Sequence, residues 1–246
     1  STKQKNILFV SFDDCFAYHH YRTAFGATLK VPNLDRISAQ ATQFQSAYCQ
    51  APVCGPSRAS LMSAKTPHQL GIFNNEINLF ERAAPQDVWS YKLKANGIFD
   101  LKAGKYNTDM APKPENHNVL YDDNRKRFGH DFSIPDNVEK RSYGGINGGW
   151  STVDDKDDEA FYDSKSANSA IDFLNTYDGD KPFYREVGFF SPHGPRFTPA
   201  RFKDMYDLNE FEMPPSWADG FEPHSYTDTH WEQTPRMVNK NVDWWR

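Results

Sequence analysis

Cysteine is scarce in this sequence, and the number of cysteines is odd. Cys15, Cys49 and Cys54 are the only three in 246 residues, which argues against a disulfide framework. Cys49 and Cys54 could pair in an oxidising compartment, but this bond would sequester Cys54, which we regard as a candidate nucleophile. A chain of this length can bury one substantial hydrophobic core, and a single domain is the default expectation.

The sequence also lacks a long apolar run and an excess of positive charge. No apolar run is long enough to span a membrane. The net charge of −5 and the absence of a basic stripe argue against a nucleic-acid partner. A hydrophobic share of 38% and a charged share of 25% are ordinary for a soluble globular protein. We therefore expect neither a membrane nor a nucleic acid as a partner.

No signal peptide precedes the first predicted strand. The first six residues, Ser-Thr-Lys-Gln-Lys-Asn, lead directly into an apolar run, as they would after loss of an initiator methionine. This start favours the cytoplasm. A signal that had already been removed would leave the same start, and the protein would then be periplasmic or secreted.

Apolar runs and amphipathic segments alternate along the chain and predict an α/β fold, with a mostly parallel central sheet flanked by helices. Residues 7–12 form a near-continuous apolar run, which is typical of a buried central strand. Further strands are predicted at 44–48, 98–103 and 182–190. Helices are predicted from residue 31, from residue 56, over 88–96 and over 158–177.

Two adjacent carboxylates follow the first predicted strand. Asp13 and Asp14 stand at its carboxyl end, where α/β sheets bind ligands. Burying both without compensation would be costly, so a divalent cation is one natural solution. The alternative is that one carboxylate caps the following turn and the other is solvated.

Cys54 stands just ahead of a predicted helix. Pro56 suits the first helical position, where its missing N–H costs nothing. The first turn of a helix presents unpaired N–H groups and the positive end of the helix dipole. With Arg58 about one turn further on, this place suits an anion or a nucleophile that meets one. A buried structural cysteine is the alternative.

These residues resemble the signature of the type I sulfatases, the formylglycine-dependent branch of the alkaline-phosphatase-like superfamily. The match consists of Cys-x-Pro-Ser-Arg at 54–58, a weaker continuation at 62–65, the strand ending in Asp-Asp and Pro-Asn-Leu-Asp at 32–35. The order and spacing of the Asp-Asp, Pro-Asn-Leu-Asp and cysteine motifs match the family. The resemblance implies the alkaline phosphatase/sulfatase-like α/β fold, incomplete at its C-terminus.

A later motif resembles the iduronate-2-sulfatase branch. Val-Gly-Phe-x-x-Pro-His-x-Pro ends the strand predicted at 182–190 and places His193 between two prolines. The resemblance implies that His193 contacts the sulfate and protonates the leaving-group oxygen. A turn histidine without a catalytic role is the alternative.

The resemblance also implies a metal site and a set of catalytic residues. Asp13, Asp14 and the modified Cys54 would bind Ca²⁺, with Mg²⁺ as the alternative. Formylglycine made from Cys54 would be the nucleophile, and Arg58 would stabilise it. Lys105 and His193 would bind the sulfate. A formylglycine-generating or anaerobic sulfatase-maturing enzyme would carry out the modification.

The chain departs from the family pattern at one catalytic position. Sulfatases have a histidine shortly after the lysine that matches Lys105, whereas Asn107 and Thr108 occupy the two candidate places here. Asparagine cannot act as an acid or base near neutral pH. His117 or His130 could replace it from the following residues.

The whole of residues 1–246 is predicted to be the N-terminal part of a sulfatase catalytic domain. Residues 106–156 would form a pocket-shaping insertion, and residues 207–246 an irregular segment rich in proline and tryptophan. The family's second group of metal ligands and second sulfate-binding lysine have no match in the sequence. A missing C-terminal half or a second chain would supply them.

The resemblance leaves more than one function open. The favoured one is hydrolysis of a sulfate monoester, on a small molecule or a saccharide. Phosphonate monoester and phosphodiester hydrolases share the cysteine signature and are the nearest alternative. A non-catalytic sulfatase-like binding protein is the third, because of Asn107 and the unmatched second half.

Overall fold

The computed structural model describes residues 5–23, 25–97, 99–102, 119–122, 150–153, 159, 161–193 and 196–212. The chain divides into two compact units, each built from separate stretches of sequence. The first comprises Ser1–Asp13, Ser46–Ser133 and Asp158–Pro192. The second comprises Asp14–Gln45, Ile134–Asp157 and His193–Arg246.

The first unit is built on a parallel sheet. Its described strands are β1 (Ile7–Asp13), β2 (Asp100–Lys102) and β4 (Phe183–Pro192), in the order β1-β4-β2. Both pairings are parallel, so the helices between the strands have to cross over the sheet. The predicted α/β class and parallel sheet are confirmed.

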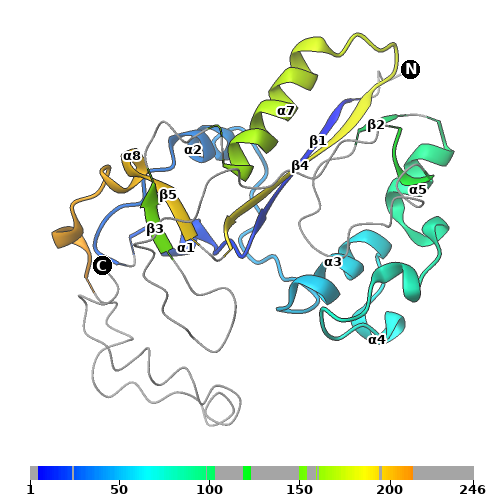
Figure 1. Ribbon diagram of the computed structural model, residues 1–246, viewed down its shortest axis with the longest axis horizontal. Coiled ribbons are helices and arrows are strands. Elements are labelled where there is room, and N and C mark those ends of the chain that lie inside the picture. The colour runs from blue at the N-terminus through cyan, green and yellow to red at the C-terminus, as the bar shows by residue number, and fades with distance from the viewer. Residues whose placement is uncertain are drawn as a thin grey trace. The chain divides into compact units, whose positions relative to one another are not determined.

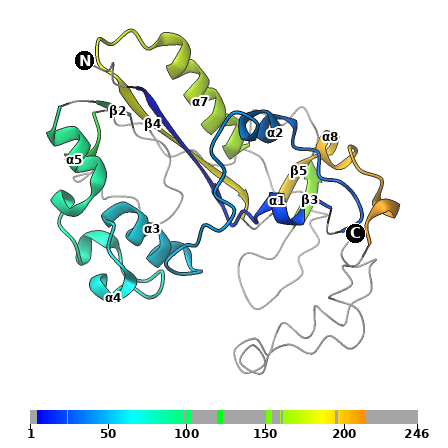
Figure 2. The same cartoon turned by 180° about the vertical axis from the view of Figure 1, so that it is seen from behind.

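Helices cover both faces of β4. Figures 1 and 2 show α7 (Tyr162–Thr176) on one side of the sheet and α3 (Cys54–Ser63) and α5 (Trp89–Ala95) on the other. Side chains of a strand alternate between the faces. Phe183 contacts Phe173 of α7, whereas Tyr184 contacts Trp89 of α5.

The main hydrophobic core lies on the α3–α5 side. The short helices α4 (Pro67–Leu70) and η1 (Leu79–Glu81) contribute residues to it, and so do the residues on either side of η2 (Pro85–Asp87). Its buried residues are Ala59, Met62, Leu70, Ile72, Leu79, Ala83, Val88, Phe99, Leu120, Tyr121 and Tyr184. The hydroxyls of Tyr121 and Tyr184 donate to the buried Glu186 carboxylate at 3.0 Å and 2.9 Å, which satisfies a charged group inside this core.

The prediction that residues 7–12 form a buried central strand is wrong in one respect. The segment is a strand, but β1 lies at one end of the described sheet, and β4 is the central, buried strand. Ile7, Leu8, Val10 and Phe12 are 39–46% exposed. An apolar run reports the capacity of a strand for burial, whereas actual burial depends on what packs against it.

Several predicted bounds shift. Residues 44–48 form no strand, because this exposed segment has no strand to pair with among the described residues. The helix predicted over 158–177 begins at Tyr162, after the extended residue Phe161. The helices predicted from residue 31 and over 88–96 are present as α2 (Pro32–Ser38) and α5.

The second unit contains a separate two-stranded parallel sheet of β3 (Trp150–Val153) and β5 (Arg196–Pro199). Its described helices are α1 (Tyr18–Tyr21), α2, α8 (Ala200–Lys203) and η4 (Leu208–Glu210). No helix within the described parts of either unit has the length and apolar character needed to cross a bilayer.

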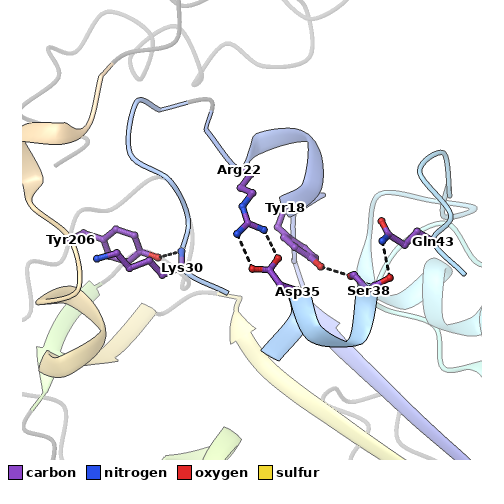
Figure 3. Close-up of polar contacts among 7 residues, drawn as sticks. All are labelled: Tyr18, Arg22, Lys30, Asp35, Ser38, Gln43 and Tyr206. Atoms are coloured by element: carbon purple, nitrogen blue, oxygen red, sulfur yellow. Dashed lines mark hydrogen bonds and ion pairs between the residues drawn. The ribbon is translucent and has the colours of Figure 1, made fainter. Parts of the chain in front are cut away.

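Polar side-chain contacts stabilise the second unit, and one of them joins the early part of the chain to the late part (Figure 3). Arg22 pairs through both of its terminal nitrogens with the Asp35 carboxylate of α2, with one distance of 2.8 Å. The Lys30 N–H donates to the Tyr206 hydroxyl at 2.8 Å. The Arg22 guanidinium holds the pKa of the Asp35 carboxyl below its usual range, mainly through the hydrogen bond.

Candidate active site

The end of β1 carries the two predicted carboxylates on an irregular backbone. Its pairing with β4 shifts register between Phe12 and Asp13, and such irregularities re-aim side chains at the end of a strand. Asp14 then adopts a left-handed conformation with φ of 54°, which aspartate tolerates better than most residues. The strict alternation of side chains along β1 therefore ends at these two residues.

Asp13 is buried and ion-paired. Its side chain is 8% exposed, and Arg58 Nη2 donates to Asp13 Oδ2 at 2.8 Å. Arg58 belongs to α3, 45 residues further along the chain. The guanidinium offsets part of the cost of burying the carboxylate, and the pair ties the end of β1 to α3.

Cys54 is the first residue of α3, so the helix begins two residues earlier than the prediction that placed Pro56 first. No side chain of the N-cap residue, Val53, satisfies the first turn. Pro56 has no N–H, and the Ser57 N–H donates to the Val53 carbonyl at 3.0 Å. The positive end of the α3 helix dipole therefore lies at Cys54.

The Cys54 thiol lies close to the Asp13 carboxylate. Cys54 Sγ and an Asp13 oxygen are within 4.8 Å of each other, and Cys54 is partly buried. A thiol, a carboxylate and a guanidinium thus gather in the first unit, at the carboxyl end of a parallel strand. This edge is where open α/β sheets bind their ligands.

Asp14 and His193 approach each other in the second unit. His193 Nε2 lies 3.8 Å from Asp14 Oδ2, which is too long for a direct hydrogen bond. The Asp14 side chain is 54% exposed and that of His193 is 19% exposed. Each residue is joined by one peptide bond to the end of a strand of the first unit, Asp14 to Asp13 and His193 to Pro192.

The remaining sequence-predicted positions lie outside the described residues, and their roles stay predictions. These positions are Lys105, Asn107, Thr108, His117 and His130. The insertion predicted over 106–156 is described only at 119–122 and 150–153, and the segment predicted over 207–246 only to residue 212.

The chemistry of the donor set fits a hard divalent cation only in part. Carboxylate oxygens such as those of Asp13 and Asp14 are the ligands that Ca²⁺ and Mg²⁺ prefer. The sulfur of an unmodified cysteine is a soft ligand and suits neither ion. An oxygen in place of the Cys54 sulfur would complete an all-oxygen set.

Asn75 is a residue of this site that no sequence motif indicates. Its side-chain oxygen, Oδ1, accepts the Gly55 N–H at 2.7 Å, at the first turn of α3. The pair Asn74-Asn75 has the composition of an ordinary turn. Since Asn75 lies 20 positions after Gly55 in the sequence, no local pattern predicts the contact.

The similarity of this chain to known proteins runs over most of its length and is not confined to the motifs. The family model described as Sulfatase matches residues 5–230. A sulfatase of Formosa agariphila is 28% identical over 231 residues, which are 87% of this chain and 44% of that protein. Human iduronate 2-sulfatase is 24% identical over 249 residues, with coverage of 92% of this chain and 42% of that protein.

Two solved structures share the fold. One, a complex with its substrate D-glucosamine-2-N,6-O-disulfate, superposes with a TM-score of 0.59 at 18% identity, over 98% of this chain and 49% of the other. The phosphonate monoester hydrolase of Agrobacterium radiobacter gives 0.54 at 16% identity, over 84% of this chain and 44% of the other. The chain thus spans less than half the length of these relatives. Because the family model covers most of residues 1–246, the chain belongs to the sulfatase family.

Proposed function

We propose that residues 1–246 contain the nucleophile and part of the metal site of a sulfuric ester hydrolase. The observation that carries the proposal is the cluster of Asp13, Cys54 and Arg58 in the first unit. Membership of the sulfatase family supports it. Since the chain spans less than half of its relatives' length, the activity is proposed for the whole protein to which these residues belong.

The metal is proposed to be Ca²⁺, with Mg²⁺ as the alternative, held by Asp13, Asp14 and an oxygen of the modified Cys54. The preference of these ions for oxygen supports conversion of Cys54 to formylglycine, because the thiol itself is a poor ligand for them. A bound cation would supply positive charge beside the nucleophilic oxygen and favour its deprotonated form. A formylglycine-generating or anaerobic maturing enzyme is the implied partner.

The protein side chains have separate tasks in this proposal. Arg58, fixed by its ion pair with Asp13, orients that carboxylate and adds positive charge beside residue 54. Lys105 binds the sulfate oxygens and neutralises charge that builds on them. His193 gives a proton to the departing alcohol oxygen, as a general acid.

The substrate is proposed to be a sulfate monoester on a saccharide. One structural relative was solved with a disulfated glucosamine, which supports this class without identifying the sugar. Sulfate and phosphate esters share their tetrahedral shape, and a phosphonate monoester hydrolase shares the fold. Hydrolysis of phosphonate monoesters is therefore the second candidate.

Turnover by the complete protein, co-expressed with a maturing enzyme, separates these candidates. We expect release of sulfate from an aryl sulfate to exceed release of alcohol from a phosphonate monoester by at least about tenfold in kcat/KM, or about 1.4 kcal/mol. Cys54→Ala should abolish this activity, whereas Cys15→Ser, a change at another thiol, should preserve it. A larger kcat/KM for the phosphonate would favour the second candidate. Absence of both activities in the matured protein would favour a binding protein.

A further inference from the structure

The first turn of α3 is satisfied by a residue outside the helix. Its first two residues are Cys54 and Gly55, and the third, Pro56, has no N–H. The Gly55 N–H donates to Asn75 Oδ1 at 2.7 Å, while the N-cap residue contributes no side-chain hydrogen bond. Asn75 therefore does for α3 what an N-cap side chain does in an ordinary helix.

The loop that presents Asn75 is held at both ends and within itself. Ile72 on one side is fully buried in the core, and Leu79 on the other is 2% exposed. Between them, the Glu76 N–H donates to Asn74 Oδ1 at 3.1 Å, and the Asn74 amide donates to the Glu76 carboxylate at 3.1 Å. Asn75 thus projects from a braced turn.

The contact between this loop and α3 leaves no room for a side chain at Gly55. A Cβ at residue 55 would lie 2.6 Å from Asn75 Oδ1 and 2.9 Å from the Asn74 carbonyl oxygen. Both distances are below any ordinary carbon–oxygen contact. The loop therefore packs directly against the backbone of Gly55.

We propose that Asn75 is a positioning residue for Cys54. By holding the Gly55 N–H, it fixes the peptide that follows Cys54 and thereby the direction in which the residue 54 side chain leaves the helix. Nothing in this role requires Asn75 to touch the substrate or the metal. Its consequence for turnover rests on the proposed function, whereas its effect on the Cys54 thiol does not.

A test that needs no enzymatic activity measures the thiol directly. In a Cys15→Ser, Cys49→Ser background, Cys54 is the single cysteine, and its alkylation by iodoacetamide is followed in the folded protein. Rates are compared on the plateau at high pH, where the thiol is fully ionised. The carboxylate introduced by the variant Asn75→Asp, used below, then cannot change the rate by changing the ionised fraction of the thiol. Asn75→Ala should raise the rate about fivefold, the factor that corresponds to loss of one typical hydrogen bond.

The matched control is Asn78→Ala. Asn78 also caps a helix by accepting a backbone N–H, that of Phe80 at 3.0 Å, but it serves η1 and not α3. This variant loses comparable stability and should leave the alkylation rate within about twofold of the unchanged background. Asn75→Asp keeps an oxygen that can accept the Gly55 N–H and should restore the rate to within about twofold.

Equal rates for Asn75→Ala and Asn78→Ala would overturn the proposal, as would failure of Asn75→Asp to restore the rate. In the matured enzyme, Asn75→Ala should lower kcat about fivefold with KM changed less than twofold, because the residue orients the reacting group and does not bind substrate. If the unsubstituted protein has no hydrolase activity, the proposed function fails, and the alkylation result still decides the role of Asn75.

Discussion

Removing the guanidinium from the Arg58–Asp13 pair gives the sharpest test of the site's electrostatics. Arg58→Met keeps much of the length of the side chain and removes its charge. It leaves the Asp13 carboxylate, which is 8% exposed, without the partner that now lies at 2.8 Å. We expect the unfolding free energy to fall.

The size of the loss follows from the burial of both groups. Breaking a fully buried ion pair costs about 3–5 kcal/mol, because it leaves an uncompensated buried charge. The Arg58 side chain retains 18% exposure, so solvent screens part of the interaction. We therefore expect a loss of about 2–3 kcal/mol.

Calcium should reduce this loss if Asp13 is a metal ligand, because a bound cation supplies the charge that the arginine no longer provides. The assay is urea denaturation of the unsubstituted protein and Arg58→Met, each with EDTA and with excess Ca²⁺. Asp13→Asn/Arg58→Met should recover part of the loss in EDTA, since no charge remains buried. Arg58→Met with unchanged stability in EDTA, or a loss that calcium leaves unaltered, would refute the reasoning.

Three further predictions concern single positions. Ala64 ends α3 with φ of 55°, a conformation that favours glycine, so Ala64→Gly should raise the unfolding free energy by about 0.5–1 kcal/mol in urea denaturation, and a decrease would contradict this. Arg22 lowers the pKa of Asp35, so the stability from this pair is present above roughly pH 4 and is lost as the pH falls through the lowered value. Asp35→Asn should therefore lower the Tm at about pH 7 but bring little change near pH 2, and an equal loss at both would count against the pair. Gly55→Ala should cost about 1–3 kcal/mol, and less when Asn75→Ala is also present, so strictly additive losses would exclude the close contact.

The sequence predicts those parts of the fold whose signals are local. The helix around Trp89 and the apolar run that becomes β4 appear where hydrophobic pattern and flanking turn residues agree. The prediction of a buried central strand for β1 and of a strand at 44–48 is wrong, because apolar or alternating residues show only that a segment is able to be buried or paired. Which neighbour lies beside it depends on chain far away in sequence.

The candidate site divides in the same way. The position of Asp13 and Asp14 at the end of a strand, and of Cys54 at the start of a helix, follows from local pattern. The ion pair between Asp13 and Arg58 and the contact of Asn75 with Gly55 join residues 45 and 20 positions apart. Such contacts arise from tertiary packing, so neither could be predicted from the motifs alone.

The modification of residue 54 is the central claim, and mass spectrometry of the peptide that contains it is the most direct test. The protein is co-expressed with a formylglycine-generating or anaerobic sulfatase-maturing enzyme, and the Cys15 peptide of the same digest serves as the internal control. We predict that Cys54 is converted to formylglycine while Cys15 keeps its thiol. An intact Cys54 thiol, in a host where a known sulfatase is converted, would contradict the account.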